Sequence, residues 1–144
     1  MGVRRVEELH AWQLAHAFKR EVYAVVRASA DASGDFRFRG QLFEAASSGE
    51  SNVEEGFHRY GAGEMLLFLS YARASIAEAR GRLKDGVDRG YYGTADAERA
   101  LALGARAAGA IAALQRSLRP FYHQRKSLKA RTRSTGHGPR KPPG

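Results

Sequence analysis

The chain has 144 residues, a net charge of +9 and no cysteine. This length suits one domain around a single hydrophobic core, and the lack of cysteine excludes disulfides, iron–sulfur clusters and thiolate zinc sites. The longest apolar run, MLLFL at 65–69, is far shorter than the about 20 residues of a membrane span, and the basic start MGVRR is not followed by the apolar core of a signal peptide, so we expect a soluble, cytoplasmic protein.

The first half of the chain predicts two amphipathic helices. Apolar residues recur at spacings of three and four between residues 4 and 30, and a second helix is expected from about residue 39, after a turn at 31–36. The middle of the second helix, AASSGES, is built of small residues that favour close approach of a neighbouring helix, although Gly49 costs about 1 kcal/mol relative to alanine. The expected apolar stripes are Leu14, Ala17, Phe18, Val22 and Val25 in the first helix, and Leu42, Ala46, Gly49, Val53 and Phe57 in the second.

The second half predicts two more helices. RYGAG at 59–63 ends the second helix, and the third runs to the turn DRGYYG at 88–93, where Tyr91 and Tyr92 are expected to pack on the bundle. The fourth helix is expected to start at an N-cap, Thr94, and to reach about Tyr122, with Pro120 bending or ending it. The expected stripes are Met65, Leu69, Ala72, Ile76, Ala79 and Leu83, then Leu101, Ala105, Ala108, Ile111 and Leu118.

Four helices with short connections predict an all-α, antiparallel up-down-up-down four-helix bundle over residues 1–122. Residues 123–144 contain one large aliphatic residue, Leu128, and three of the four prolines of the chain. Such a segment buries too little apolar surface to order by itself, so a disordered basic tail is predicted there. This topology places the start of the first helix, the end of the second, the start of the third and the root of the tail at one end of the bundle.

The basic charge is concentrated at the C-terminus. Residues 1–118 carry 16 Lys and Arg against 15 Asp and Glu, whereas residues 119–144 carry eight and none. A polycationic extension favours a nucleic acid or another polyanion as partner, the alternative being a tail that only improves solubility. Phe121 and Tyr122 at its root suit either stacking on unpaired bases or the last turn of the core. The candidate nucleic-acid-binding residues are Arg4, Arg5, Arg59, Arg116, Arg119, Arg125, Lys126, Lys129, Arg131 and Arg133.

Two Glu-x-x-His pairs, in EELH at 7–10 and EEGFH at 54–58, raise the question of a di-metal carboxylate bundle enzyme. That motif also requires glutamates from the other two helices. Glu78 is expected about 20 Å along the third helix from the pairs, Glu98 begins the fourth helix at the far end, and only Glu64 is near enough. A metal enzyme is therefore the remote alternative. The paired residues are Glu7 with His10 and Glu55 with His58.

Two further side chains stand out by type. Asn52 lies beside the apolar stripe of its helix and is expected to fix helix register rather than to act as a catalytic amide. Trp12 lies opposite the main stripe of the first helix, where it is either an anchor between subunits or packed against a neighbouring helix. With no hydrolase triad, phosphate-binding glycine loop or zinc motif in the sequence, we expect a protein that is not an enzyme and needs no cofactor or metal.

Three stretches, LHAWQLAH, QLFEAASSGESNVEEGFHR and EMLLFLSYARASIAEAR, resemble a known family over roughly residues 5–120. It is the family of four-helix-bundle proteins encoded in intervening sequences of bacterial 23S rRNA genes, related to the accessory variability proteins of diversity-generating retroelements. The matching positions are Leu9, Trp12, Gln13, Ala15, Gln41, Leu42, Ala45, Ala46, Ser48, Asn52, Glu55, Gly56, Glu64, Phe68, Leu69, Ala72, Ser75 and Glu78.

The resemblance implies a bundle without enzymatic activity that assembles into ring-like homopentamers and binds RNA, more than DNA, or protein. The retroelement branch implies binding to a reverse transcriptase and its RNA, so a scaffold or accessory subunit is the alternative function. The chain departs from the family where Phe43 and Glu44 replace two basic residues, where Gly49 and Glu50 replace Ile-Pro, and where Gly61 replaces a capping serine. The first departure weakens any nucleic-acid surface on the second helix.

Overall fold

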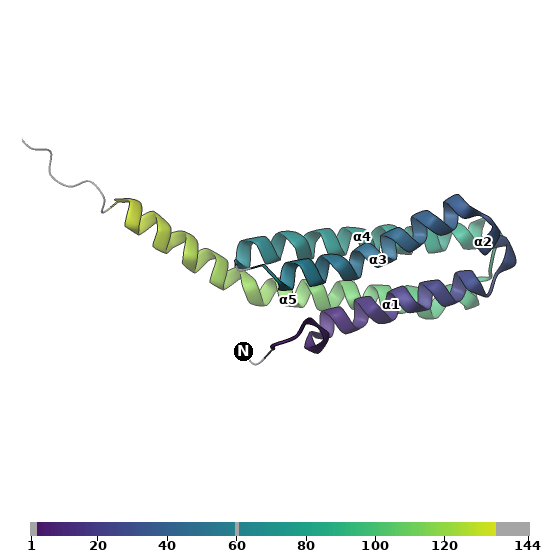
Figure 1. Cartoon of the computed structure of the whole chain (residues 1–144), viewed down its shortest axis with the longest axis horizontal. Coiled ribbons are helices and arrows are strands. Elements are labelled where there is room, and N and C mark those ends of the chain that lie inside the picture. Colours follow the sequence, from purple (N-terminus) through teal and green to yellow (C-terminus); the bar gives the residue numbers. More distant parts are fainter. Residues whose placement is uncertain (1–2, 60, 135–144) are drawn as a thin grey trace, which may run out of the picture.

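The protein is described by a computed structural model that covers residues 3–59 and 61–134. Within these ranges every regular element is a helix, and no helix is both long and apolar enough to cross a membrane (Figure 1). Each long helix, α1, α3, α4 and α5, packs against two others, in the cyclic order α1, α3, α4, α5, which confirms the antiparallel four-helix bundle. The elements are η1 (Val6–Glu8), α1 (His10–Arg27), α2 (Ala30–Gly34), α3 (Phe36–Phe57), α4 (Ala62–Asp88) and α5 (Thr94–Ser134).

The connection between α1 and α3 holds the short helix α2, which the sequence predicted to be a turn. The Ser29 side chain accepts a hydrogen bond from the Ala32 backbone N–H at 3.1 Å, and the Asp35 side chain does the same for Phe38 at 3.1 Å. Serine and aspartate satisfy N–H groups at a helix start that have no acceptor within the helix. These two caps create α2 and start α3 about three residues before the predicted position.

The apolar stripes of α1, α3 and α4 form the core largely as predicted. Phe18, Val22, Leu42, Val53 and the stripe of α4 from Leu69 to Leu83 are fully buried, whereas Ala17, Phe57 and Met65 are half-buried. For α5 the wrong side of the helix was predicted to face the core. Of the predicted stripe Ile111 is buried, but Leu101, Ala108 and Leu118 are half-buried and Ala105 is exposed. The residues of α5 that are buried are Ala97, Ala100, Gly104, Ala107, Ile111 and Gln115.

Small residues decide how closely the helices approach. A methyl group at Gly49 of α3 would lie 2.7 Å from Cγ1 of Ile76 in α4, and one at Gly104 of α5 would lie 2.9 Å from the ring of Phe18 in α1. Real side-chain carbons do not approach so closely, so only glycine allows these helix pairs to pack as they do. The close packing expected from AASSGES is therefore confirmed at Gly49, and the same device explains the buried stripe of α5.

At the far end of the bundle, Tyr91 and Tyr92 pack the turn between α4 and α5 onto the helices, as predicted. The buried Tyr92 hydroxyl donates to the Leu83 carbonyl at 2.8 Å, and the Tyr91 hydroxyl donates to Oδ2 of Asp35 at 2.5 Å. Burial, with a smaller contribution from the charge of Asp85, raises the pKa of Tyr92 to about 12, so this hydroxyl remains a hydrogen-bond donor into the alkaline range. These bonds fix α5 at its start.

The last helix differs most from the prediction. The bundle was expected to end near Tyr122 and the chain to be disordered from residue 123, but α5 continues through Pro120 to Ser134 and projects from the end of the bundle (Figure 1). Pro120 removes one backbone hydrogen bond, yet Arg116, four residues earlier, is exposed, so water can reach its carbonyl. Residues 123–134 contain no glycine or proline and are rich in good helix formers. We call residues 119–134 the α5 extension; the predicted disorder of residues 135–144 lies outside the described residues.

Candidate nucleic-acid interface

The predicted basic residues all lie at or beyond one end of the bundle, and all are exposed. Arg4 and Arg5 precede η1, Arg59 follows the end of α3, and Arg116 is on the last turn of α5 inside the bundle. These segments and the α5 extension share the end of the molecule from which α5 projects (Figure 1). The α5 extension contributes Arg119, Arg125, Lys126, Lys129, Arg131 and Arg133, and contains no Asp or Glu.

The basic residues on the bundle itself are partly neutralised by acidic neighbours. Arg59 forms an ion pair with Glu55, one turn earlier, and its guanidinium lies 5.0 Å from the centre of the Phe68 ring. The Arg5 guanidinium lies 3.6 Å from the Glu7 carboxylate. Exposed ion pairs of this kind contribute little to stability, but they lower the positive potential that a polyanion meets. Because residues 1–118 carry a net charge of only +1, most of the net positive charge of the described residues lies on the α5 extension.

A groove separates the α5 extension from the start of α4. It has a volume of about 630 Å³. One wall is the segment Gly61–Glu64, and the other contains Arg125, Lys126 and Lys129, three of the predicted basic residues. Tyr122 completes the second wall. The groove is thus lined by three cations, one aromatic ring and one carboxylate, that of Glu64.

Sequence reasoning identified the cations of this groove but not the groove. Its two walls are about sixty residues apart in the chain, and they meet only because α5 remains helical beyond Pro120. The signal that the sequence did contain is spacing, because Tyr122, Lys126 and Lys129 are four and three residues apart, as on one side of a helix.

The Glu-x-x-His pairs do not form a metal centre. Within the described residues, no group of three or more His, Asp or Glu side chains is arranged to hold a metal ion. Glu7 faces Arg5, Glu55 is paired with Arg59, and the His58 ring contacts the ring of Phe57 edge to face at 5.4 Å. The carboxylates are therefore used in ion pairs at the basic end.

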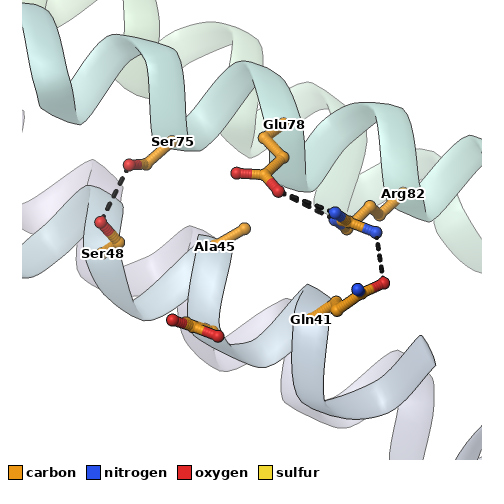
Figure 2. Close-up of a pocket in the computed structure, with 7 residues that line it drawn as sticks. Gln41, Ala45, Ser48, Ser75, Glu78 and Arg82 are labelled. Carbon is orange, nitrogen blue, oxygen red and sulfur yellow. Dashed lines mark hydrogen bonds and ion pairs between the residues drawn. The ribbon is translucent and has the colours of Figure 1, made fainter. Parts of the chain in front are cut away.

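A second depression, between α3 and α4, is lined by five residues that carry the family resemblance (Figure 2). Ser48 Oγ lies 2.9 Å from Ser75 Oγ, and the Arg82 guanidinium bridges Glu78, at 2.9 Å, and the Gln41 amide oxygen, at 2.7 Å. These side chains satisfy one another across the two helices, as Figure 2 shows. We infer that Gln41, Ser48, Ser75 and Glu78 hold α3 to α4. Asn52 contacts Ser48 from within α3, where its amide donates to the Ser48 carbonyl at 2.8 Å and to Ser48 Oγ at 3.0 Å.

Between α1 and α3 lies a polar cluster that sequence reasoning missed. Glu50 is buried, with 8% of the residue exposed, and its carboxylate is 2.8 Å from the Lys19 ammonium and 3.0 Å from Nδ1 of His16. Trp12 stacks on His16, with ring centres 4.7 Å apart, and donates from Nε1 to Glu54 at 2.9 Å. Trp12 is therefore packed against a neighbouring helix. A buried carboxylate needs such partners, so the cluster joins the two helices through Glu50.

Comparison with known proteins agrees with this architecture. No curated protein matches the chain. A family described as the 23S rRNA-intervening sequence protein matches residues 7–112, which covers all four long helices up to the last turns of α5 inside the bundle and stops before the α5 extension. This is not a known enzyme family. The match covers well over half of the chain, which therefore belongs to the 23S rRNA-intervening sequence protein family.

Proposed function

We propose that this protein binds RNA through the α5 extension and does so without catalysing a reaction. The observation that carries the proposal is a projecting helix with six Lys and Arg, no Asp or Glu, and every residue exposed. RNA is proposed rather than DNA because the family resemblance implies binding to RNA more than to DNA. The bundle beneath holds this helix at a fixed root.

The expected mode of binding is electrostatic. Lysine and arginine side chains on the α5 extension contact phosphates and displace the cations that neutralise them, so the affinity depends steeply on salt. Phosphate contacts orient a nucleic acid but do not distinguish its sequence, so this surface alone gives affinity rather than sequence preference.

The test compares two sets of charge removals in the full-length chain. In the first variant, Arg125, Lys126, Lys129 and Arg133 are replaced by Gln; in the control, Gln replaces Arg20, Arg37, Lys84 and Arg106, which are exposed on the bundle. Binding to a fluorescent RNA is measured between 50 and 300 mM salt. We expect the first variant to bind far more weakly, with the slope of log K against log salt reduced by about 3, because each phosphate contact contributes about 0.7 to 0.9.

The control variant has the same net charge as the first, so it separates a local binding surface from a general effect of charge. Equal loss of RNA affinity in the two variants would contradict the proposal, as would salt-independent binding by the unaltered protein.

Self-association is a second proposal, favoured by one feature of α4. Leu67 and Tyr71 are one turn apart on α4 and remain 49% and 48% exposed, although they are large and apolar. Exposed apolar neighbours of this kind are typical of contact surfaces. The homopentameric ring that the resemblance implies, and a partner such as a reverse transcriptase, remain predictions.

A further inference from the structure

Two of the three cations that line the groove, Lys126 and Lys129, continue the buried side of α5. Ile111 and Gln115 face the core, and the same spacing of three and four residues leads out of the bundle to Tyr122 and Lys126. A helix turns once every 3.6 residues, so these positions lie on one side of it. The bundle therefore aims this side of the extension toward α4. The full series is Gly104, Ala107, Ile111, Gln115, Leu118, Tyr122, Lys126, Lys129 and Arg133.

The size and charge of the groove suit a ligand of nucleotide size with negative charge. Its volume of about 630 Å³ is within the range of about 300 to 1,000 Å³ that is usual for small-molecule sites. Arg125, Lys126 and Lys129 outnumber the single carboxylate, Glu64, and no ion pair between these three cations and an acidic side chain is found in the described part of the chain.

Tyr122 packs closely against Gly63 in the wall of this groove. A methyl group on Gly63 would lie 2.9 Å from Cε2 of the Tyr122 ring, so the ring occupies space that only glycine leaves open. The residue nevertheless remains 38% exposed. An aromatic ring that packs against the protein on one side, stays partly open on the other and is flanked by cations resembles the arrangement with which proteins bind single-stranded nucleic acids.

Phe121, the adjacent residue, is on a different side of the helix. Successive residues are about 100° apart around a helix axis, and Phe121 does not line the groove although it is 58% exposed. The two aromatic residues at the root of the extension thus have different surroundings, which the sequence left open.

We infer that this groove binds an unpaired stretch of RNA, with a base stacked on Tyr122 and the adjoining phosphates on Arg125, Lys126 and Lys129. The inference rests on the proposed function and adds a preference for unpaired over paired nucleotides. In a duplex the bases are stacked on one another and cannot reach the ring, so a duplex contacts only the cations.

The experiment measures the affinity of full-length protein for a single-stranded RNA of 12 nucleotides and for the duplex of the same sequence. Three variants are compared: Tyr122→Ala, Tyr122→Phe, and the control Phe121→Ala. We expect Tyr122→Ala to weaken single-strand binding on the order of five- to a hundredfold, the usual effect of losing one stacked base, and to leave duplex binding unchanged. Tyr122→Phe keeps the ring and is expected to bind as the unaltered protein does, and so is Phe121→Ala.

Each other outcome has a distinct meaning. If both RNAs bind in a salt-dependent way but Tyr122→Ala and Phe121→Ala behave alike, the groove is not the site of unpaired bases and only this inference fails. If neither RNA binds to the unaltered protein, the proposed function itself fails. Circular dichroism checks that every variant is folded. Because Phe121 and Tyr122 are both exposed, we do not expect their substitution to unfold the protein.

Discussion

The single helix α5 passes through two environments, and comparing them shows what holds each part in place. Between Thr94 and Leu118 it is packed against α1 and α4 through small residues and Ile111, whereas from Arg119 to Ser134 every residue is exposed. Most helical stability in proteins comes from packing of an apolar face, and the rest from local propensity. Changes in the first part are therefore expected to alter the fold, and changes in the second to alter binding.

The two parts of α5 are expected to differ most in how far the free energy of unfolding falls when one aliphatic side chain in each part is shortened. Ile111→Ala removes a fully buried side chain from the core and is expected to lower the free energy of unfolding by about 2 to 5 kcal/mol. Leu128→Ala, at a position 55% exposed, is expected to change it by less than about 0.5 kcal/mol. Urea unfolding followed by circular dichroism measures both values. Similar losses in the two variants would mean that the α5 extension is packed against something in solution.

A smaller contrast is available at two glycines inside the bundle part of α5. Gly104→Ala would place a methyl group 2.8 Å from Cδ of Arg80 and 2.9 Å from the Phe18 ring, so we expect a loss of about 1 to 3 kcal/mol from crowding. Gly109→Ala meets no atom within 4 Å and should stabilise the protein by up to about 1 kcal/mol, because alanine is the better helix former. The sign of the change in unfolding midpoint distinguishes the two, and stabilisation by both variants would contradict the close approach of α5 to α1.

The smallest effect on the whole fold is expected at Pro120, where the two parts meet. Pro120→Ala restores a backbone hydrogen bond and replaces proline by a residue that is about 3 kcal/mol more favourable inside a helix. The change lies, however, in a region that contributes little to the core. We expect slower amide hydrogen exchange in residues 121–134 and almost no change in the free energy of unfolding. Ser127→Ala is the control for a substitution within the α5 extension. A large rise in overall stability would show that the two parts unfold together.

Much of the fold could be predicted from spacing, and the failures have specific causes. The stripes of α3 and α4 contain large apolar residues at regular intervals, so their buried sides were identified. In the bundle part of α5 alanine is the commonest residue, with ten of the 25 positions from 94 to 118, and apolar residues lie all around the helix. Periodicity therefore could not reveal that Gly104 and Ala107 face the core while Ala105 faces solvent. The short helix α2 was missed because a capped helix of five residues has the composition of a turn.

The candidate site was predicted as a set of exposed cations but not as a shape. The exposure of these cations was expected from the excess of Lys and Arg in a segment with few apolar residues. The groove, in contrast, depends on a contact between Gly63 and Tyr122 that no local sequence pattern reveals. The polar cluster around Glu50 was missed for the same reason, since its partners Lys19 and His16 belong to another helix.

Because α5 stays helical through Pro120, the packing of its buried side in the bundle determines the direction in which the charged side chains of the α5 extension point. Adding or removing one residue between Ile111 and Tyr122 would rotate everything beyond by about 100°, and the cations that line the groove would then point away from α4. The number of residues between Ile111 and Tyr122 is thus as important to the proposed binding surface as the lysines and arginines themselves. Such a segment would tolerate substitution of its exposed residues better than the insertion or deletion of a single residue.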